Sequence, residues 1–122
     1  MDEHQESPPV DPKLPPQTPP QRIHKYKIRD VRPGIVAATM PPAACILKIE
    51  FQGNQLTCWA EVDDTNARLE REFYLAPTGG KVPDGVYIDT VFGGTFVWHL
   101  YETEESYSRD MAAWGAQLEK AV

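Results

Sequence analysis

Apolar and polar residues alternate in short stretches from residue 23 onward, and a period of two residues indicates β-strands with one buried face. Residues 23–28 alternate first, and residues 32–34 have the composition of a turn before a second strand over residues 35–40. Pro41 and Pro42 end that strand because proline lacks the amide hydrogen that a strand donates to its neighbour. The pattern therefore predicts two short strands before residue 41.

Residues 44–51 and 55–62 give the clearest hairpin signal, since two apolar runs flank Gly53-Asn54. With a two-residue turn, one face of the hairpin holds only apolar residues, paired as Phe51 with Leu56, Ile49 with Cys58, Leu47 with Ala60, and Cys45 with Val62. The other face is polar apart from Ile46 and Trp59. A shift of one residue would mix the two sets, so the pattern predicts the register as well.

Two further strand segments follow. Residues 68–76 alternate, although Arg71 interrupts their apolar side, and a loop rich in glycine and proline runs from residue 77 to residue 85. Residues 86–92 and 95–102 then form a second hairpin around Gly93-Gly94, and both of its faces are largely apolar. We therefore expect this hairpin to be covered on both sides.

The last segment has helical periodicity. Thr103 can cap the N-terminus of a helix whose first turn carries Glu104 and Glu105, as the helix dipole favours. An apolar stripe that we expect to lie on the sheet consists of Tyr107, Met111, Trp114, Leu118 and Ala121. The predicted fold is mainly β (α+β): about seven short, mostly antiparallel strands in a small sandwich or half-barrel with a C-terminal amphipathic helix.

Composition divides the chain. It contains 122 residues and 12 prolines, and seven of these prolines fall within residues 1–22. That segment has too few apolar side chains to form a core, so we expect a disordered proline-rich arm, either a solvated spacer or a ligand for a proline-binding groove. The folded part is predicted as a β domain over residues 23–102 and a helix over residues 103–121. The chain has no apolar run long enough for a membrane span and no secretion signal, so we expect a cytoplasmic protein.

Charge and cysteine content narrow the function. Eighteen acidic against twelve basic residues give a net charge of −6, which disfavours nucleic acid as a partner. Cys45 and Cys58 lie four positions apart along the predicted hairpin, ~13 Å at the rise of a strand. A disulfide requires Cα atoms within about 7 Å, so two reduced, buried thiols are expected.

Residues for catalysis are scarce. No HxH, HExxH or CxxC motif occurs, and the predicted register places Asp89 opposite Trp98 and His99 opposite Ile88, on different faces. We expect a satisfied boundary histidine, no enzyme activity, no cofactor and no metal. Most carboxylates are expected only to be solvated: Asp63, Asp64, Glu70, Glu72, Glu102, Glu104 and Glu105.

Two places remain as candidate sites. Trp59 is a large aromatic residue on the polar face of the first hairpin, and the candidate partner-binding surface consists of Trp59, Lys48, Thr57 and Glu61. The other is a candidate loop site for an anionic small molecule, made of Thr78, Gly79, Gly80, Lys81 and His99. The loop lacks the spacing of a phosphate-binding loop and precedes a strand rather than a helix.

Several motifs together resemble a family. They are His24-Lys25-Tyr26, Met40-Pro41 with Ala44-Cys45-Ile46-Leu47, Thr57-Cys58-Trp59-Ala60-Glu61, Tyr87-Ile88-Asp89-Thr90, and Val97-Trp98-His99-Leu100-Tyr101-Glu102. In order and spacing, residues 23–102 resemble a family of small uncharacterised domains of bacteriophages and prophages. The family has no assigned activity, and its members commonly carry Gly-His where this chain has Gly79-Gly80. The resemblance implies a phage-derived accessory protein in a bacterial cytoplasm or a minor part of the virion.

The first expectation for function is a non-enzymatic protein that binds a host bacterial protein, such as an inhibitor of a defence or transcription component. The first alternative is a minor virion structural protein that uses the arm as a tether between neighbouring subunits. The second alternative is a binder of a nucleotide-like small molecule. The sequence leaves the oligomeric state open, including a homo-oligomer.

Overall fold

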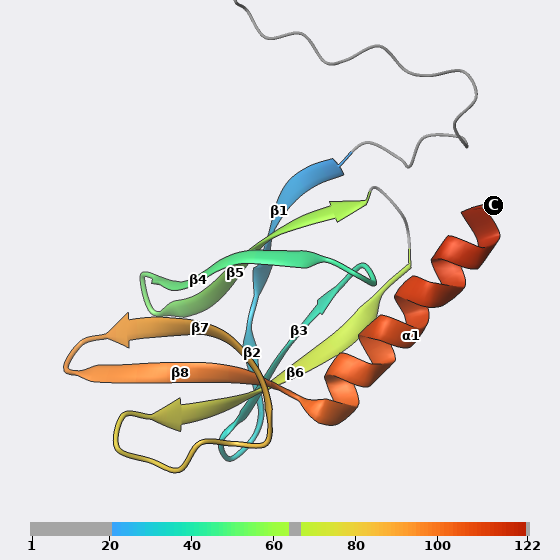
Figure 1. Ribbon diagram of the computed structural model, residues 1–122. Coiled ribbons are helices and arrows are strands. Elements are labelled where there is room, and N and C mark those ends of the chain that lie inside the picture. The colour runs from blue at the N-terminus through green and yellow to red at the C-terminus, as the bar shows by residue number, and fades with distance from the viewer. Residues whose placement is uncertain (1–20, 64–66, 122) are drawn as a thin grey trace, which may run out of the picture.

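The computed structural model describes residues 21–63 and 67–121. Residues 1–20 of the proline-rich arm expected over residues 1–22, and Asp64 of the expected solvated carboxylates, lie outside these residues, whereas Gln21 and Arg22 of the expected arm belong to a strand. The described chain forms eight strands followed by one helix, and every strand pairing is antiparallel (Figure 1). The predicted fold class, mainly β with a C-terminal helix, is therefore confirmed.

The elements follow the predicted order, with one strand more than expected. Their bounds are β1 Gln21–Lys27, β2 Arg29–Arg32, β3 Ile35–Met40, β4 Cys45–Gln52, β5 Gln55–Asp63, β6 Leu69–Pro77, β7 Gly85–Gly93, β8 Phe96–Thr103 and α1 Glu104–Ala121. The first strand begins at Gln21, two residues before the predicted start of the folded part. The extra strand, β2, follows directly after Ile28, where the chain passes from one sheet into the other.

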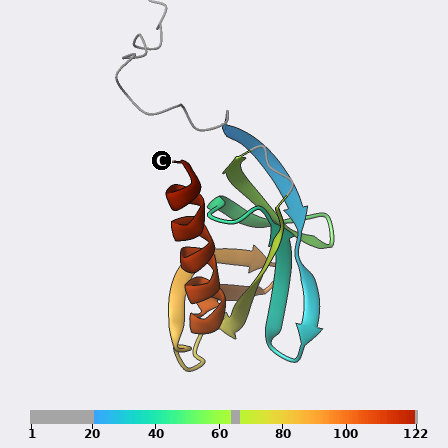
Figure 2. The ribbon, with the colours of Figure 1, turned by 90° about the vertical axis from the view of Figure 1, so that its right-hand side faces the viewer.

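The strands form a partly open barrel of two sheets. One sheet has the order β1-β5-β4 and the other the order β2-β3-β6-β8-β7. Along one seam the chain itself joins the sheets, since β1 runs into β2 (Figure 2). Along the other seam β4 lies beside β7, and the amide of Ile49 donates to Oδ2 of Asp89 at 2.8 Å. A carboxylate thus replaces the backbone acceptor that a closed barrel would supply.

The interior between the sheets is apolar. Residues at alternating positions in the strands point inward, and the buried cluster consists of Ile28, Val36, Ala38, Met40, Ala44, Ile49, Leu56, Cys58, Ala60, Val62, Phe73, Val91 and Leu100. Both sheets contribute to this one cluster. It is the main source of the hydrophobic stabilisation of the fold.

The first hairpin has the predicted turn and, over most of its length, the predicted register. Phe51 pairs with Leu56, Ile49 with Cys58, and Lys48 with Trp59. A bulge at Leu47 then shifts the pairing, so that Ile46 faces Ala60 and Cys45 faces Glu61. Ile46 packs against the core, whereas Leu47 and Cys45 are exposed. The expectation that Leu47 and Cys45 lie on the buried face is wrong because the bulge turns them outward.

The second hairpin differs from its predicted register. Gly93 pairs with Phe96, so that the turn is Gly94-Thr95 and not Gly93-Gly94. A Cβ on Gly93 would lie 2.7 Å from Cε2 of Phe51, whereas Gly94 has a φ of +63° and nothing within 4 Å. Glycine is therefore needed in the strand at residue 93 and in the turn at residue 94. The pairing is shifted by two positions from the predicted register. A shift by an even number of residues leaves each side chain on its predicted face, so Val91 and Leu100 are buried as expected.

Helix α1 packs against β6, β7 and β8, and in its first two turns the buried residues are polar rather than members of the predicted apolar stripe. Thr103 caps the helix as predicted, since its Oγ1 accepts from the amide of Ser106 at 3.1 Å. Ser106 and Asp110 are buried, whereas Tyr107 and Met111 of the predicted stripe are exposed. The side chains of its other members, Trp114, Leu118 and Ala121, lie outside the described part of the helix.

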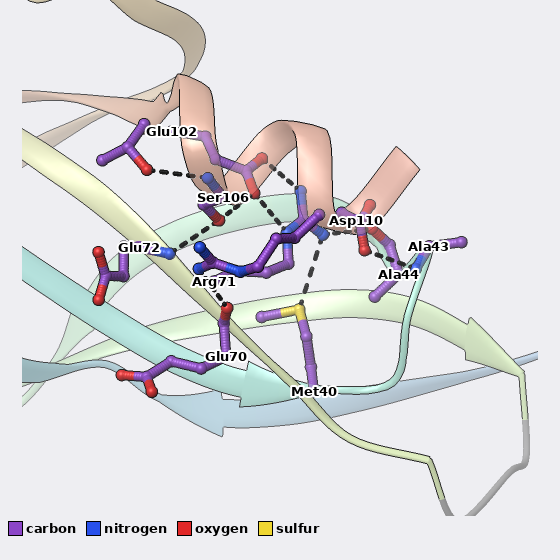
Figure 3. A network of polar contacts seen from close by, with 11 residues as sticks. Met40, Ala43, Ala44, Glu70, Arg71, Glu72, Glu102, Ser106 and Asp110 are labelled. Atoms are coloured by element: carbon purple, nitrogen blue, oxygen red, sulfur yellow. Dashed lines mark hydrogen bonds and ion pairs between the residues drawn. The ribbon is translucent and has the colours of Figure 1, made fainter. Parts of the chain in front are cut away.

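The polar helix face is explained by a buried ion pair beneath it (Figure 3). Nη2 of Arg71 lies 2.7 Å from Oε1 of Glu102, and Nε donates to Oε2 at 2.9 Å. Ser106 Oγ donates to the same Oε2 at 2.7 Å and accepts from the amide of Glu72 at 3.0 Å. Glu102 is 0 % exposed, so the expectation that it is merely solvated is wrong.

The remaining donors of the buried guanidinium also have partners. Nη1 of Arg71 donates to the carbonyl of Ala44 at 2.7 Å, and Asp110 accepts from the amide of Ala43 at 2.7 Å. Burial by itself lowers the pKa of Arg71, but the hydrogen bond to Glu102 and the charges of Glu102 and Asp110 outweigh burial and raise it. The guanidinium is therefore charged at any ordinary pH, and its bonds join β6 to β8 and to the segment just before β4, while Ser106 connects Glu102 to α1.

We expect Glu102→Leu to lower the free energy of unfolding by about 3–5 kcal/mol, because it leaves the guanidinium of Arg71 charged and buried. The double variant Arg71→Met, Glu102→Leu should recover part of that loss, since no isolated charge remains. The matched control is Arg29→Ala, which removes the exposed pair with Glu70 and should cost less than about 1 kcal/mol. Urea unfolding measures all three, and equal losses for Glu102→Leu and Arg29→Ala would contradict the role given to the pair.

Candidate functional site

The loop between β6 and β7 encloses a small cavity on the outer side of β8. The cavity has a volume of about 220 Å³, and its lining includes all five predicted loop-site residues: Thr78, Gly79, Gly80, Lys81 and His99. The loop turns sharply at Gly79, which has a φ of +90°, and the amide of Gly80 donates to the carbonyl of Pro77 at 3.0 Å. The structure thus brings the loop together with a histidine that lies far from it in the sequence.

His99 holds this loop to the sheet. Its Nε2 lies 2.9 Å from Oγ1 of Thr78, and its Nδ1 lies 3.1 Å from Oγ1 of Thr90. Tyr87 extends the chain of contacts, since its hydroxyl lies 2.5 Å from the same Thr90 oxygen. Both ring nitrogens of His99 therefore have partners, which matches the expectation of a satisfied boundary histidine.

Asp89 lies on the face of the β7–β8 hairpin opposite to His99 and is bonded to β4. Its carboxylate accepts from Ile49 across the seam of the barrel and lies 3.6 Å from Nζ of Lys48. This arrangement agrees with the expectation that Asp89 and His99 lie on different faces, although the residues that they pair with are Leu100 and Thr90.

The predicted partner-binding surface is smaller than expected. Trp59 lies on the outer face of the three-stranded sheet, in register between Lys25 of β1 and Lys48 of β4. Glu61 lies two residues further along the same strand and is half-buried. Thr57, however, is only 1 % exposed, and its hydroxyl donates to the carbonyl of Gln55 at 2.9 Å. Thr57 is therefore not available to a partner, and Trp59 itself is partly covered.

A second aromatic surface was not predicted from the sequence. Phe92 is 74 % exposed and Phe96 is 62 % exposed, and the ring of Phe96 stacks on Trp98 with centroids 5.9 Å apart. Phe51 of the other hairpin lies beneath Gly93, and a cavity of about 270 Å³ separates the two turns. Phe96 and Trp98 lie on the face of the hairpin that carries Val91, whereas Phe92 lies on the opposite face with Val97. We call Phe51, Phe92, Phe96 and Trp98, which together present aromatic rings on both sides of the turn, the aromatic tip. It lies at the end of the barrel away from α1 (Figure 1).

The aromatic tip was missed because both faces of the second hairpin are expected from the sequence to be covered. That expectation holds for Val91 and Leu100 but is wrong for Val86 and Tyr87, which are exposed near the start of β7. It is also wrong for Phe92 and Phe96, which lie beside the turn and beyond the opposing strands. The signal in the sequence is the pair of phenylalanines that flank Gly93-Gly94-Thr95. Apolar residues directly beside a hairpin turn seldom reach a core.

A cavity beside α1 belongs to the structural network. It has a volume of about 470 Å³ and includes Ala43, Cys45, Arg71, Asp110 and Met111 in its lining. The donors of Arg71 and the carboxylate of Asp110 are already bonded within the protein. In residues 21–63 and 67–121, no three His, Cys, Asp or Glu side chains come close enough to hold a metal ion.

Comparisons with known proteins give one match. A family model described as a domain of unknown function (DUF7352) matches residues 19–110. No curated protein and no solved structure matches the chain. The matched range contains all eight strands and the buried helix residues Ser106 and Asp110. No described helix is long and apolar enough to cross a membrane.

The two thiols should react at very different rates. Both are free, as predicted, but Cys45 is exposed whereas burial raises the pKa of Cys58 to about 12. We expect an aromatic disulfide reagent at about pH 8 to titrate one thiol quickly in the native protein and the second only in denaturant. Cys45→Ser should abolish the fast reaction. Two fast thiols, or none, would contradict the register of β4 and β5.

Proposed function

The chain belongs to the DUF7352 family of domains of unknown function, and we propose that it is a protein-binding domain whose contact surface is the aromatic tip. One observation carries the proposal: two phenylalanine side chains, Phe92 and Phe96, are 74 % and 62 % exposed beside the turn of one hairpin. Single exposed apolar residues are ordinary, but two phenylalanines that project from opposite faces beside one turn expose apolar surface on both sides of the hairpin end, which is typical of binding surfaces. The ring of Trp98, stacked against Phe96, extends this cluster along β8.

The physical gain from covering these rings is large. Full burial of a phenylalanine side chain contributes about 1.5–3 kcal/mol, so Phe92 and Phe96 together can anchor a stable complex. Aromatic residues are also enriched among the few side chains that dominate binding energy. A partner with an apolar cleft that receives the turn and contacts both of its faces therefore fits this surface best.

The aromatic tip is also held in place before a partner arrives. The stack of Phe96 on Trp98 fixes one ring, and the close approach of Gly93 to Phe51 fixes the two hairpins against each other. Aromatic side chains have few rotatable bonds, so little conformational entropy is lost when they bind. The barrel thus serves as a rigid support for its exposed end.

The partner that we propose is a protein of a bacterial host. The resemblance of the motifs around Trp59 and residues 97–102 to phage and prophage domains supports this choice. The net charge of −6 favours a partner whose surface around the apolar cleft is basic. A component of host defence or transcription would act in the same compartment as a phage accessory protein. A minor virion protein is the alternative, and mass spectrometry of purified particles would detect it there.

We expect affinity capture from a bacterial host lysate to recover a stoichiometric protein with the wild-type chain. The double variant Phe92→Ser, Phe96→Ser should lose that protein, because it removes both anchors without altering the buried core. Val82→Ser is the matched control, since Val82 is 72 % exposed and lies in another loop. Retention by the double variant, or equal loss in the control, would overturn the aromatic tip as the contact surface. Trp59→Ala in the same assay tests the surface that the sequence favoured.

The loop cavity is a second candidate, favoured by the assembly of all five predicted residues around one space. Thermal unfolding with a panel of nucleotides and cyclic dinucleotides tests it. A ligand at about 100 times its Kd should stabilise the wild-type chain by about 2.7 kcal/mol, and the gain should be smaller for Lys81→Ala. Unchanged Tm values across the panel would remove this candidate.

A further inference from the structure

Strand β1 leaves one edge of the three-stranded sheet open. Within the described part of the chain, β1 pairs with β5 on one side and with no strand on the other. The amide of Ile28 donates to the carbonyl of Leu56 at 2.9 Å. Ile28 directly follows β1, so this bond shows which residues of β1 direct their amides and carbonyls toward β5. Bonded and non-bonded pairs alternate in an antiparallel ladder. The amides and carbonyls of Ile23 and Lys25 therefore point to the open edge.

This edge is basic in an acidic protein. Strand β1 has the sequence QRIHKYK, with Arg22, Lys25 and Lys27 and no acidic residue. Nζ of Lys25 donates to the neutral amide oxygen of Gln52 at 2.9 Å, so that its charge is not balanced by this contact. The nearest acidic residues of the paired strand, Glu61 and Asp63, lie opposite Ile23 and Gln21 at the start of β1.

The side chains on the outer face of β1 also form a pattern. Lys25 and Lys27 are two residues apart and share that face with Ile23, which is 67 % exposed. An incoming strand would place alternate side chains beside these three residues. Carboxylates suit the two lysines, and an apolar side chain suits Ile23.

We propose that β1 binds an extended acidic segment of a partner protein, which adds to the sheet as a further strand. Main-chain hydrogen bonds to Ile23 and Lys25 supply the docking, and carboxylates beside Lys25 and Lys27 supply the selectivity. This surface lies on a different sheet from the β7–β8 hairpin and does not depend on the function proposed for the aromatic tip.

The charges around β1 favour an acidic peptide over two other occupants of the edge, a second copy of the chain and a nucleic acid. A second copy of β1 would bring Arg22, Lys25 and Lys27 against like charges, which is unfavourable. A single-stranded nucleic acid needs a basic groove with several stacking rings. A nucleic acid stacked on Trp59 would lie across the outer face of the sheet and meet Glu50 and Glu61, whereas a strand added beyond β1 is separated from them by β1 itself.

The test uses the full chain and a labelled octapeptide in which glutamate and valine alternate. Fluorescence anisotropy should show saturable binding that weakens about tenfold or more when glutamine replaces glutamate in the peptide. Lys25→Glu with Lys27→Glu should cause a similar loss, whereas the control Arg109→Glu, an exposed basic residue of α1, should leave the affinity within about twofold.

A backbone variant separates strand addition from simple charge attraction. Ile23→Pro removes an amide that points to the open edge and leaves the bonds to β5 intact, so it should weaken the peptide by about tenfold. Ile23→Ala keeps that amide and should have a smaller effect. Circular dichroism melts of each variant verify that the barrel is folded.

Several results would overturn the proposal. They are equal affinity for the glutamate and glutamine peptides, equal effects of Ile23→Pro and Ile23→Ala, and tighter binding of oligo-dT than of the acidic peptide. If sedimentation shows a dimer of the wild-type chain and Ile23→Pro abolishes that dimer, the open edge of β1 binds a second copy of the chain instead. The variant Phe92→Ser, Phe96→Ser should still bind the peptide, so failure of the aromatic tip and failure of the β1 edge give different results.

Discussion

The buried pair of Arg71 and Glu102 determines how the barrel and the helix fit together. Arg71 interrupts the apolar side of β6, and a guanidinium in that position is tolerated only when its donors have partners. Glu102 supplies two acceptors, and the carbonyl of Ala44 supplies another. The carboxylate in turn needs a donor from α1, which Ser106 provides. The polar face of the helix follows from this requirement.

The two ends of the barrel differ because the buried ion pair lies at only one of them. At one end, α1 covers the ion pair, and the polar groups there are occupied by one another (Figure 3). At the other end, the two hairpin turns meet, and Phe92 and Phe96 face solvent. The end covered by α1 carries buried charged and hydroxyl groups of the kind found in active sites, but here they bind one another and stabilise the fold. The other end exposes aromatic side chains that are suited to binding a protein, and we therefore propose that the partner contacts this end.

Much of the fold could be predicted from the alternation of apolar and polar residues, and the failures share a physical cause. The turn at Gly53-Asn54, the strand over residues 35–40 and the cap at Thr103 are all local, and each was predicted correctly. The bulge at Leu47 and the turn at Gly94-Thr95 depend on contacts with distant strands, such as that between Gly93 and Phe51. A periodic pattern contains no information on such contacts. The burial expected for Tyr107 and Met111 is wrong for the same reason, since the partner of the first helix turns is an ion pair that only the folded barrel assembles.

The candidate sites show the same division. The five residues proposed for the loop site line one cavity, because the turn residues of the loop and His99 could be recognised locally in the sequence. The exposure of Phe92 and Phe96, in contrast, depends on where the opposing strands end. The most direct test of the aromatic tip is a photo-crosslinking amino acid placed at residue 92 in bacterial cells, with residue 82 as the matched position. A single discrete adduct from residue 92 and none from residue 82 is the predicted result. The same adducts from both positions, or no adduct from residue 92, would contradict the account.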